Sequence, residues 1–491
     1  MSKKITRREF ISRGSAGLAA GTVILSTSAK SYANIQGAND MINMAIIGIR
    51  GRGNEHINNF GRMKNVKIKY LVDVDENLFE ARLANAEKIA SYRPKIEWDM
   101  RKVFDDKDVD VVATATPNHW HALTTVWAAQ AGKHVYVEKP ASHNVWEGRQ
   151  MVEASRKYNV LIQVGFQNRS IRNTIRAIEL LHSGKLGKIY MARGLCFKPR
   201  PNIGKYPDGF LKAGEKYRLN LETNRYEPPY TEEYMSKVHY DMWLGPAKSR
   251  PFNRNRFHYN WHWFWDYGNG DTGNQGPHQF DIARWGLNKN ENPVKVRSFG
   301  GFFAYDSSQE TPNTQTSLFE YADGTILEFG TRGLYTNPEG VLLPDIQITA
   351  NGQISSSTKA KPVTIGDIFY GTEGWLQIDA GGNWQTFFGR NNEPGPTSGE
   401  ADDSYDPMDL TGAGGGGHFQ NFIDAVRSGK RSDLNCDIEV GHRSTTLPLI
   451  ANISYRLGRE LTLDGDKEKF VNDSEADAML KDDYRKPYIV L

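Results

Sequence analysis

The stretch VDVVATATPNHWHALTTVWAAQAGKHVYVEKP, residues 109–140, sets out a strand, a helix and a second strand in order. Val109–Ala115 is a short β-branched apolar run, which suits a buried strand and is too short for a buried helix. Residues 119–131 have helical spacing and stop at Gly132, the kind of position where glycine commonly closes a helix. Residues 134–137 form the next short apolar run. The pattern predicts a β-α-β unit of a parallel sheet.

Polar side chains follow each of the two predicted strands. In an open parallel sheet the ligand crevice lies outside the carboxyl ends of the strands, so these side chains are expected to share one crevice. They supply an amide, two imidazoles, a carboxylate and an amine, from Asn118, His119, His121, Glu138 and Lys139. The sequence therefore predicts a site at this edge of the sheet.

Length and composition indicate a globular protein of two domains. The chain has 491 residues, too many for one simple core, and 38% of them are hydrophobic. The net charge is +3, but residues 1–33 hold six basic side chains against Glu9 alone, which leaves −2 for the rest. That charge gives no general reason to bind nucleic acid. Two cysteines exclude a disulfide framework and a cysteine zinc site, and no other residue pattern suggests a metal, so we expect none.

The first residues resemble a twin-arginine export signal. Thr6-Arg7-Arg8-Glu9-Phe10-Ile11 precedes a mildly apolar run, residues 16–25, and Ser31-Tyr32-Ala33 resembles a cleavage site. The apolar run is shorter than the ~20 residues of a membrane span, so no stable membrane anchor is expected. We therefore expect a signal peptide over residues 1–33, export by the twin-arginine (Tat) machinery and a periplasmic protein. A frayed basic terminus is the alternative interpretation.

A glycine-rich turn follows the first predicted strand, Met41–Ile47, and leads into a helix. In Gly48-Ile49-Arg50-Gly51-Arg52-Gly53 the middle glycine of G-x-G-x-x-G is replaced by Arg50, so Gly51 would have to approach a pyrophosphate. The next strand ends at Asp73, where a carboxylate binds the adenosine ribose and repels a 2′-phosphate. NAD is therefore favoured, while Arg50 and Arg52 leave NADP open.

Three motifs occur together in the first half of the chain. They are T-P-N-x-x-H at residues 116–121, A-G-K-H-V-x-x-E-K-P at 131–140 and V-G-F-Q-N-R at 164–169. Together they closely resemble the Gfo/Idh/MocA family of sugar and polyol oxidoreductases, and the resemblance covers residues 42–465. It implies an NAD(P)-binding Rossmann domain with a doubly wound parallel sheet over residues 42–165. It also implies a C-terminal α/β domain with an open, mostly antiparallel sheet over residues 166–491, which carries the substrate site and the contact of an expected homo-oligomer.

The resemblance also implies roles for individual residues. Lys139 would be a catalytic acid or base, the Lys139–Pro140 bond would be cis, and Glu138 would lie near the nicotinamide ribose. Lys139 can act as a base if burial and neighbouring cations lower its pKa, and a salt bridge with Glu138 is the structural alternative. The residues expected to bind the cofactor are Gly48, Arg50, Gly51, Arg52, Asp73, Thr116, Asn118, His121, Glu138, Lys139 and Gln167.

A second polar stretch, residues 268–285, becomes helical in its second half and places His278 and Asp281 on one face. The resemblance aligns this pair with the family's H-x-x-D motif, in which His278 binds the substrate hydroxyl or relays its proton. Family dehydrogenases usually have an aspartate four residues before that histidine, where this chain has Asn274. Because an amide cannot shuttle a proton, either Asp271 replaces the aspartate or the proton path differs.

An aromatic run, WHWFWD at residues 261–266, precedes this stretch. Its rings suit stacking on the apolar faces of sugars, with an aromatic plug in the core as the alternative. The candidate catalytic residues are therefore Lys139, His278, Asp271 and Asn274. The candidate substrate contacts are Trp265, Asn274, His278 and Asp281.

Three functions are consistent with these residues. The leading hypothesis is an NAD(P)-dependent oxidoreductase that passes a hydride from a secondary hydroxyl of a sugar or glycoside to nicotinamide. The second is a glycosidase with tightly bound NAD that uses transient oxidation and elimination, as in the family 109 glycoside hydrolases. Against this hypothesis, those enzymes have a motif like E-V-P where this chain has Glu138-Lys139-Pro140. In its favour, a periplasmic location would suit an enzyme that retains its cofactor. The third is a non-catalytic sugar-binding protein.

Overall fold

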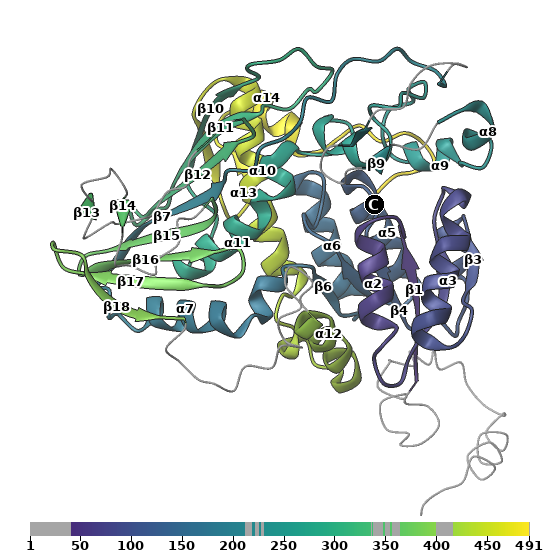
Figure 1. The fold of residues 1–491 in the computed structure, drawn as a ribbon, viewed down its shortest axis with the longest axis horizontal. Helices are drawn as coiled ribbons and strands as arrows, with labels where there is room; N and C mark the ends of the chain where they lie inside the picture. Colours follow the sequence, from purple (N-terminus) through teal and green to yellow (C-terminus); the bar gives the residue numbers. More distant parts are fainter. Residues whose placement is uncertain are drawn as a thin grey trace, which may run out of the picture. The chain divides into compact units, whose positions relative to one another are not determined.

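A computed structural model describes residues 41–211, 219–220, 225–226, 230–334, 336, 347–348, 354–355, 364–398 and 416–490 of the chain. The predicted signal peptide, residues 1–33, lies outside the described residues. The described residues form two large sheets and the helices that connect and cover them (Figure 1).

The first sheet has six parallel strands in the order β3-β2-β1-β4-β5-β6. Apolar side chains fill the central strands on both faces, so β1, β4 and β5 are continuous hydrophobic runs without alternation. The strand order is that of a dinucleotide-binding Rossmann sheet. The strands are Ile42–Ile47 (β1), Val66–Val72 (β2), Lys95–Glu97 (β3), Val111–Thr114 (β4), His134–Val137 (β5) and Ile162–Val164 (β6).

Helices connect these parallel strands. They are Arg52–Phe60 (α2), Phe79–Ala90 (α3), Met100–Phe104 (α4), Asn118–Gln130 (α5) and Val145–Lys157 (α6). Helix α5 starts directly after Pro117, and α6 starts with a capping box. In that box the Asn144 side chain accepts from the Glu147 backbone, and the Glu147 carboxylate accepts from the Asn144 backbone. Helices α5 and α6 therefore begin at residues that the local sequence specifies.

The second sheet has ten strands in the order β18-β17-β16-β15-β7-β12-β11-β10-β19-β20. Only β7 and β12 pair in parallel within it, so the sheet is mostly antiparallel. Its strands are Ile189–Cys196 (β7), Lys295–Gly301 (β10), Thr314–Glu320 (β11), Ile326–Arg332 (β12), Ile365–Gly371 (β15), Gly374–Asp379 (β16), Trp384–Phe388 (β17), Glu393–Thr397 (β18), Leu461–Asp464 (β19) and Lys469–Phe470 (β20).

One long helix, Ile438–Leu457 (α13), joins the two sheets. It packs against α6 and β6 of the first sheet and against β10 and the helix Gly276–Gly286 (α11) of the second. Helices α11 and Arg172–His182 (α7) cover the second sheet beside it. The predicted fold class, a doubly wound parallel sheet followed by an α/β part with a mostly antiparallel sheet, is confirmed.

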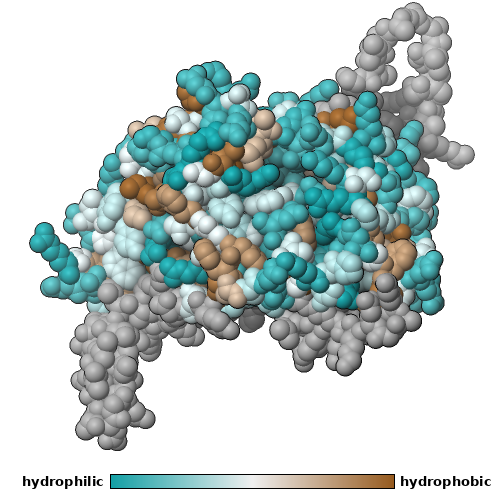
Figure 2. All heavy atoms as spheres, turned by 90° about the horizontal axis from the view of Figure 1, so that it is seen from above, coloured by the Kyte–Doolittle hydropathy of each residue, from teal (hydrophilic) through white to brown (hydrophobic). Residues whose placement is uncertain are grey.

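The surface seen from above in Figure 2 is largely polar, and its hydrophobic residues are scattered among charged ones. Single exposed hydrophobic side chains such as Phe299 and Phe303 are ordinary on a protein surface. Across the described ranges, no helix combines the length and the apolar character that crossing a membrane requires.

Close contact between α2 and the turn after β1 requires glycine at position 53. A Cβ at Gly53 would lie 1.8 Å from the carbonyl oxygen of Gly48. We therefore expect Gly53→Ala to destabilise the fold by about 1–3 kcal/mol, the usual cost of overpacking, despite the helix preference of alanine. The matched control is Gly51→Ala, because a Cβ there has no heavy atom within 4 Å. Thermal unfolding should show a lower Tm for the first variant only, and equal Tm values would contradict this contact.

Candidate functional site

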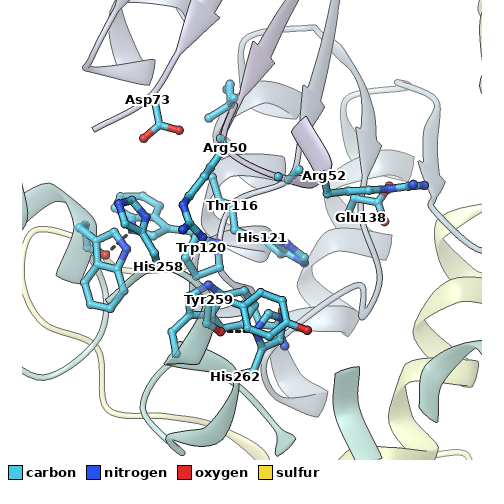
Figure 3. A pocket seen from close by; sticks show the side chains of 18 of the residues that line it. Arg50, Arg52, Asp73, Thr116, Trp120, His121, Glu138, His258, Tyr259 and His262 are labelled. Carbon is cyan, nitrogen blue, oxygen red and sulfur yellow. Dashed lines mark hydrogen bonds and ion pairs between the residues drawn. The ribbon is translucent and has the colours of Figure 1, made fainter. Parts of the chain in front are cut away.

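A cleft of about 390 Å³ runs along the carboxyl ends of the Rossmann strands. Figure 3 shows Asp73, Arg50 and Thr116 on one side of it, with His258 and other residues of the short helix His258–Trp263 (η4) opposite. All eleven residues predicted to bind the cofactor line this cleft, and so do Asn274 and His278. The structure thus brings together polar groups from both predicted strand ends and from the second polar stretch.

The glycine turn at residues 48–53 forms the end of the cleft at which β1 stops. Gly48 has a φ of +78°, and a Cβ there would lie 2.8 Å from the backbone nitrogen of Thr116. Arg82 donates two hydrogen bonds, 2.7 and 2.6 Å long, to carbonyl groups of the turn. Gly51 instead faces open space, and α2 begins at the next residue. A rigid turn that leads into a helix N-terminus and leaves open space suits a bound phosphate.

The carboxylate of Asp73 lies next to this turn. The backbone nitrogen of Ile49 donates to its Oδ2 at 2.8 Å, and that of Asp75 donates to its Oδ1 at 3.0 Å. Burial raises the pKa of Asp73 to about 6, against the lowering effect of the two hydrogen bonds. At neutral pH the group is therefore mostly ionised, and it places a negative charge at the end of β2.

Glu138 is a buried anion in the middle of the cleft. Arg52 Nε donates to its Oε1 at 2.8 Å, and His56 Nε2 and Gln167 Nε2 lie 3.0 and 3.2 Å from the same oxygen. Burial alone would raise the pKa of Glu138, but Arg52 and His56 hold it well below its usual range. Because Glu138 is engaged by these groups, the alternative salt bridge with its neighbour Lys139 is not formed.

The amine of Lys139 reaches across the cleft to the short helix Gly270–Asn274 (α10). Lys139 Nζ donates to the backbone carbonyl of Asn274 at 2.7 Å and lies 3.3 Å from its side-chain Oδ1. Burial lowers the pKa of Lys139 to about 8, opposed by the nearby Glu138 carboxylate. An amine with this pKa can take up or release a proton near neutral pH. The peptide bond after Lys139 is cis, as the resemblance implied.

Two imidazoles of the cleft are held in the neutral form. Burial, together with the positive charge of Lys139, lowers the pKa of His278 to about 3. Burial also lowers the pKa of His121, whose ring nitrogens lie 2.9 and 2.7 Å from the carbonyl oxygens of Thr116 and Pro140. The ring of His121 thus contacts the backbone through both nitrogens. The neutral ring of His278 can instead bind a hydroxyl group in the cleft.

Asp271 and Asp281 do not line the cleft, contrary to expectation. Arg200 Nε and Nη2 donate to the Asp271 carboxylate at 2.8 and 2.6 Å, and both side chains are 5% exposed. Asp281 is buried against Arg169, which binds both its oxygens, and the Ser444 hydroxyl donates to it at 2.6 Å. Asp271 is thus held in a buried ion pair with Arg200, outside the residues that line the cleft.

Trp265 and His119 also lie outside the cleft. Both line a separate cavity of about 190 Å³, where the guanidinium of Arg456 lies 5.1 Å from the centre of the Trp265 ring. His119 Nε2 is 3.0 Å from the carbonyl oxygen of Trp243. Trp265 therefore does not line the main cleft, whereas Trp261 and His262 of the same aromatic run do.

Several residues of the cleft had been given no role from the sequence. They are Trp98, Trp120, Trp243, His258 and Tyr259, whereas Trp261 and His262 belong to the aromatic run that was expected to stack on sugars. Trp243, His258 and Tyr259 come from residues 198–260, a stretch of weak periodicity that is rich in Pro, Asn, Tyr and Arg. In the parts of the chain that the structure describes, no group of three or more His, Cys, Asp or Glu side chains could hold a metal ion.

Comparisons with known proteins agree with this arrangement. Residues 42–166 match the family model described as "Oxidoreductase family, NAD-binding Rossmann fold". Residues 226–331 and 416–490 match the model described as "Oxidoreductase family, C-terminal alpha/beta domain".

Two solved structures have the same fold at 17% identity. The structure of levoglucosan dehydrogenase in complex with NADH has a TM-score of 0.59, and the match covers 85% of this chain and 98% of the dehydrogenase chain. The structure of aldose-aldose oxidoreductase from Caulobacter crescentus has a TM-score of 0.58, and the match covers 86% of this chain and 100% of the oxidoreductase chain.

Curated relatives match shorter stretches. Levoglucosan dehydrogenase of Pseudarthrobacter phenanthrenivorans is 38% identical over 96 residues, which are 20% of this chain and 25% of that protein. A glycosyl hydrolase family 109 protein of Solibacter usitatus is 30% identical over 198 residues, 37% of this chain and 45% of that protein. The chain thus matches less than half the length of either relative. From the two family models, the chain belongs to the Gfo/Idh/MocA family of oxidoreductases and carries its NAD-binding Rossmann fold.

Proposed function

We propose that this chain is an NAD-dependent oxidoreductase that oxidises a secondary hydroxyl of a sugar or glycoside. The observation that carries the proposal is a single cleft in which Lys139 and His278 share the space beside the glycine turn. A relative named levoglucosan dehydrogenase and another named myo-inositol 2-dehydrogenase, from Thermotoga maritima, support a cyclic polyol or sugar as the substrate class.

The residues of the cleft fit a dinucleotide. Gly51 and the start of α2 offer open space and a helix N-terminus to a pyrophosphate, and Asp73 would accept hydrogen bonds from ribose hydroxyls. NAD bound there supplies the hydride acceptor, the nicotinamide ring. The side chains that would surround the nicotinamide end are Asn118, His121, Glu138 and Gln167.

Lys139 acts as the general base in this proposal. Its neutral amine accepts the proton of the substrate hydroxyl while the hydride leaves the adjacent carbon. The Asn274 carbonyl holds the resulting ammonium group through the 2.7 Å hydrogen bond, and the buried Glu138 carboxylate stabilises the positive charge. His278, which is neutral, binds the same hydroxyl oxygen. Because Asn274 cannot carry a proton, the proton leaves directly from Lys139 instead of passing through a carboxylate.

Glycoside cleavage with a bound NAD is the second candidate. The family 109 relative of Solibacter usitatus, at 30% identity, favours it. In that reaction the same hydroxyl oxidation by Lys139 would precede elimination of the aglycone and return of the hydride. The two candidates therefore share the first chemical step and differ only in the products that accumulate.

Hydride transfer should depend on the neutral form of Lys139. We expect the single-turnover rate of nicotinamide reduction, with a sugar and glycoside panel, to rise with pH and to level off above about 8, where Lys139 loses its proton. Lys139→Ala should slow this step by about 10²- to 10⁴-fold and remove the pH dependence. Lys139→Arg, which keeps the positive charge but no titratable base, is the matched control and should be equally slow.

The products of the same panel separate the candidate functions. An oxidised sugar with reduced nicotinamide indicates the dehydrogenase. Release of nitrophenol from a nitrophenyl glycoside, without net oxidation, indicates the glycosidase. Sugar binding without either product would contradict both, and equal rates for wild type and Lys139→Ala would contradict the role of this amine.

Asp73 should determine the preference for NAD over NADP. In Asp73→Asn the side chain keeps a hydrogen-bond acceptor for the turn but loses the charge that repels a 2′-phosphate. We expect the ratio of the NADP and NAD dissociation constants to fall by at least about tenfold. Asp110→Asn, which alters a carboxylate bound to the Asn43 backbone, is the control and should leave the ratio unchanged. An unchanged ratio in Asp73→Asn would assign cofactor choice to other groups, such as Arg50.

The Arg200–Asp271 pair should stabilise the fold without taking part in proton transfer. Asp271→Asn leaves the buried guanidinium without its counter-charge, so we expect the free energy of unfolding to fall by about 3–5 kcal/mol. Replacing both residues by leucine should recover much of that loss. Denaturant unfolding measures both variants. If Asp271→Asn kept wild-type stability and lost the chemical step, Asp271 would be a proton carrier after all.

A further inference from the structure

The upper wall of the cleft is formed by residues 230–263, here called the roof segment. It contains the short helices Glu232–Met235 (α8), Tyr240–Leu244 (α9) and η4. In Figure 1, α8 and α9 are seen beside the Rossmann helices, and Figure 3 shows His258, Tyr259 and His262 facing Asp73 and Arg50 across the cleft. Its cleft-lining residues are Trp243, His258, Tyr259, Trp261 and His262.

The roof segment is fastened to the Rossmann sheet at Asp75, two residues beyond Asp73. Tyr234 Oη donates to Asp75 Oδ2 at 2.7 Å, and His258 Nε2 lies 2.8 Å from the same oxygen. Asp75 is fully buried, and Asn77 satisfies its other oxygen at 2.8 Å. These contacts involve two points of the roof segment that are 24 positions apart, so one carboxylate holds both. We call Asp75, Tyr234 and His258 the latch.

Further contacts hold the same segment along the length of the cleft. The backbone of Glu76 donates to Lys237, and the backbone of His239 donates to Val74, at 2.9 and 2.8 Å. The His239 ring stacks on Trp98 at 3.9 Å. At the other end the carbonyl oxygen of Trp243 accepts from Trp120 Nε1 at 3.0 Å. The roof segment therefore bridges from the strand end after β2 to the start of α5.

The roof segment also has a hydrophobic core of its own. Tyr230, Trp243, Phe252, Phe257 and Trp263 are buried together in one cluster that is separate from the cores of the two sheets. Their rings pack edge-to-face or tilted, with centroids about 5–6 Å apart. This packing makes the segment one compact unit. Opening it therefore requires breaking the latch together with the backbone and ring contacts described above.

We propose that the latch slows the release of the bound nucleotide from the cleft. This inference rests on the proposed nucleotide function. A dinucleotide that lies along the glycine turn and Asp73 has the roof segment above its adenosine half. Release of Tyr234 and His258 by Asp75 removes two of the contacts that hold the roof segment over that half of the cleft. The latch residues are positioning residues, because they act on the cofactor through the roof segment.

The test measures how fast bound NADH leaves, which does not depend on catalysis. The full-length protein is loaded with NADH and mixed with excess NAD, and the loss of bound NADH fluorescence gives the dissociation rate. Tyr234→Phe removes one latch hydroxyl and should raise this rate at least tenfold. Adding His258→Asn should raise it further. Glu76→Gln, which weakens the exposed 2.6 Å contact with His239, should give a smaller increase and places little demand on folding.

Tyr92→Phe is the matched control. It removes a hydroxyl that accepts from the Ile68 backbone in the same sheet, at 2.7 Å and away from the cleft, and it should leave the rate unchanged. Wild-type protein that binds NADH but exchanges it within the mixing time would overturn the retention proposal and leave the proposed function standing. Latch variants that release NADH at the same rate as Tyr92→Phe would also overturn the retention proposal and leave the proposed function standing. Wild-type protein that binds no NADH at all would overturn both proposals.

Discussion

The hydrogen bond from Lys139 Nζ to the Asn274 carbonyl joins the two sheets at the point where chemistry is expected. The amine comes from the loop after β5, and the carbonyl comes from α10, beside the second sheet. Burial makes the charged form of the amine costly, and one carbonyl and one nearby carboxylate only partly compensate. The pKa therefore falls to about 8, which puts proton transfer within reach at neutral pH. Neither sheet alone would provide this environment.

Charge along the cleft follows from which carboxylates are neutralised by protein groups. Glu138 is fixed by Arg52 and His56, so it acts as a permanent anion. Asp73 is bound only by backbone N–H groups and keeps its charge for a ligand. Asp271 is neutralised by Arg200 and serves the fold. Three similar carboxylates thus have three roles, and the difference lies in the partner that the tertiary structure provides.

The roof segment links the chemistry to the cofactor. Oxidation of a hydroxyl beside Lys139 needs a dry cleft, because water would stabilise the ammonium form and raise its pKa. The aromatic and histidine side chains of the roof segment supply that cover. The contacts at Asp75 that hold this cover in place are the same contacts that would slow the departure of a nucleotide. Under both proposals, exclusion of water and slow release of the cofactor would have a common structural cause.

Much of the first sheet and of the cofactor side of the cleft could be predicted from the sequence. Short β-branched runs such as β4 and β5 need no partner information, because a strand buried on both faces must be apolar along its whole length. The polar residues that follow such strands must meet at one edge, so Asn118, Glu138 and Lys139 could be placed together. The strands β15 and β17 lack a regular alternation, and their burial depends on neighbours far along the chain.

The same distinction applies to the candidate site. Asp271 was a plausible proton carrier from spacing alone, but Arg200, 71 positions earlier, reaches its carboxylate. Trp265 had the right ring for a sugar, but the chain turns it into another cavity under Arg456. For the first sheet, the sequence by itself determined which residues form strands, turns and strand ends, because backbone geometry and the spacing of apolar residues are local. Only the tertiary structure decided which charge meets which partner and which ring faces the cleft, because those pairings depend on contacts between distant parts of the chain.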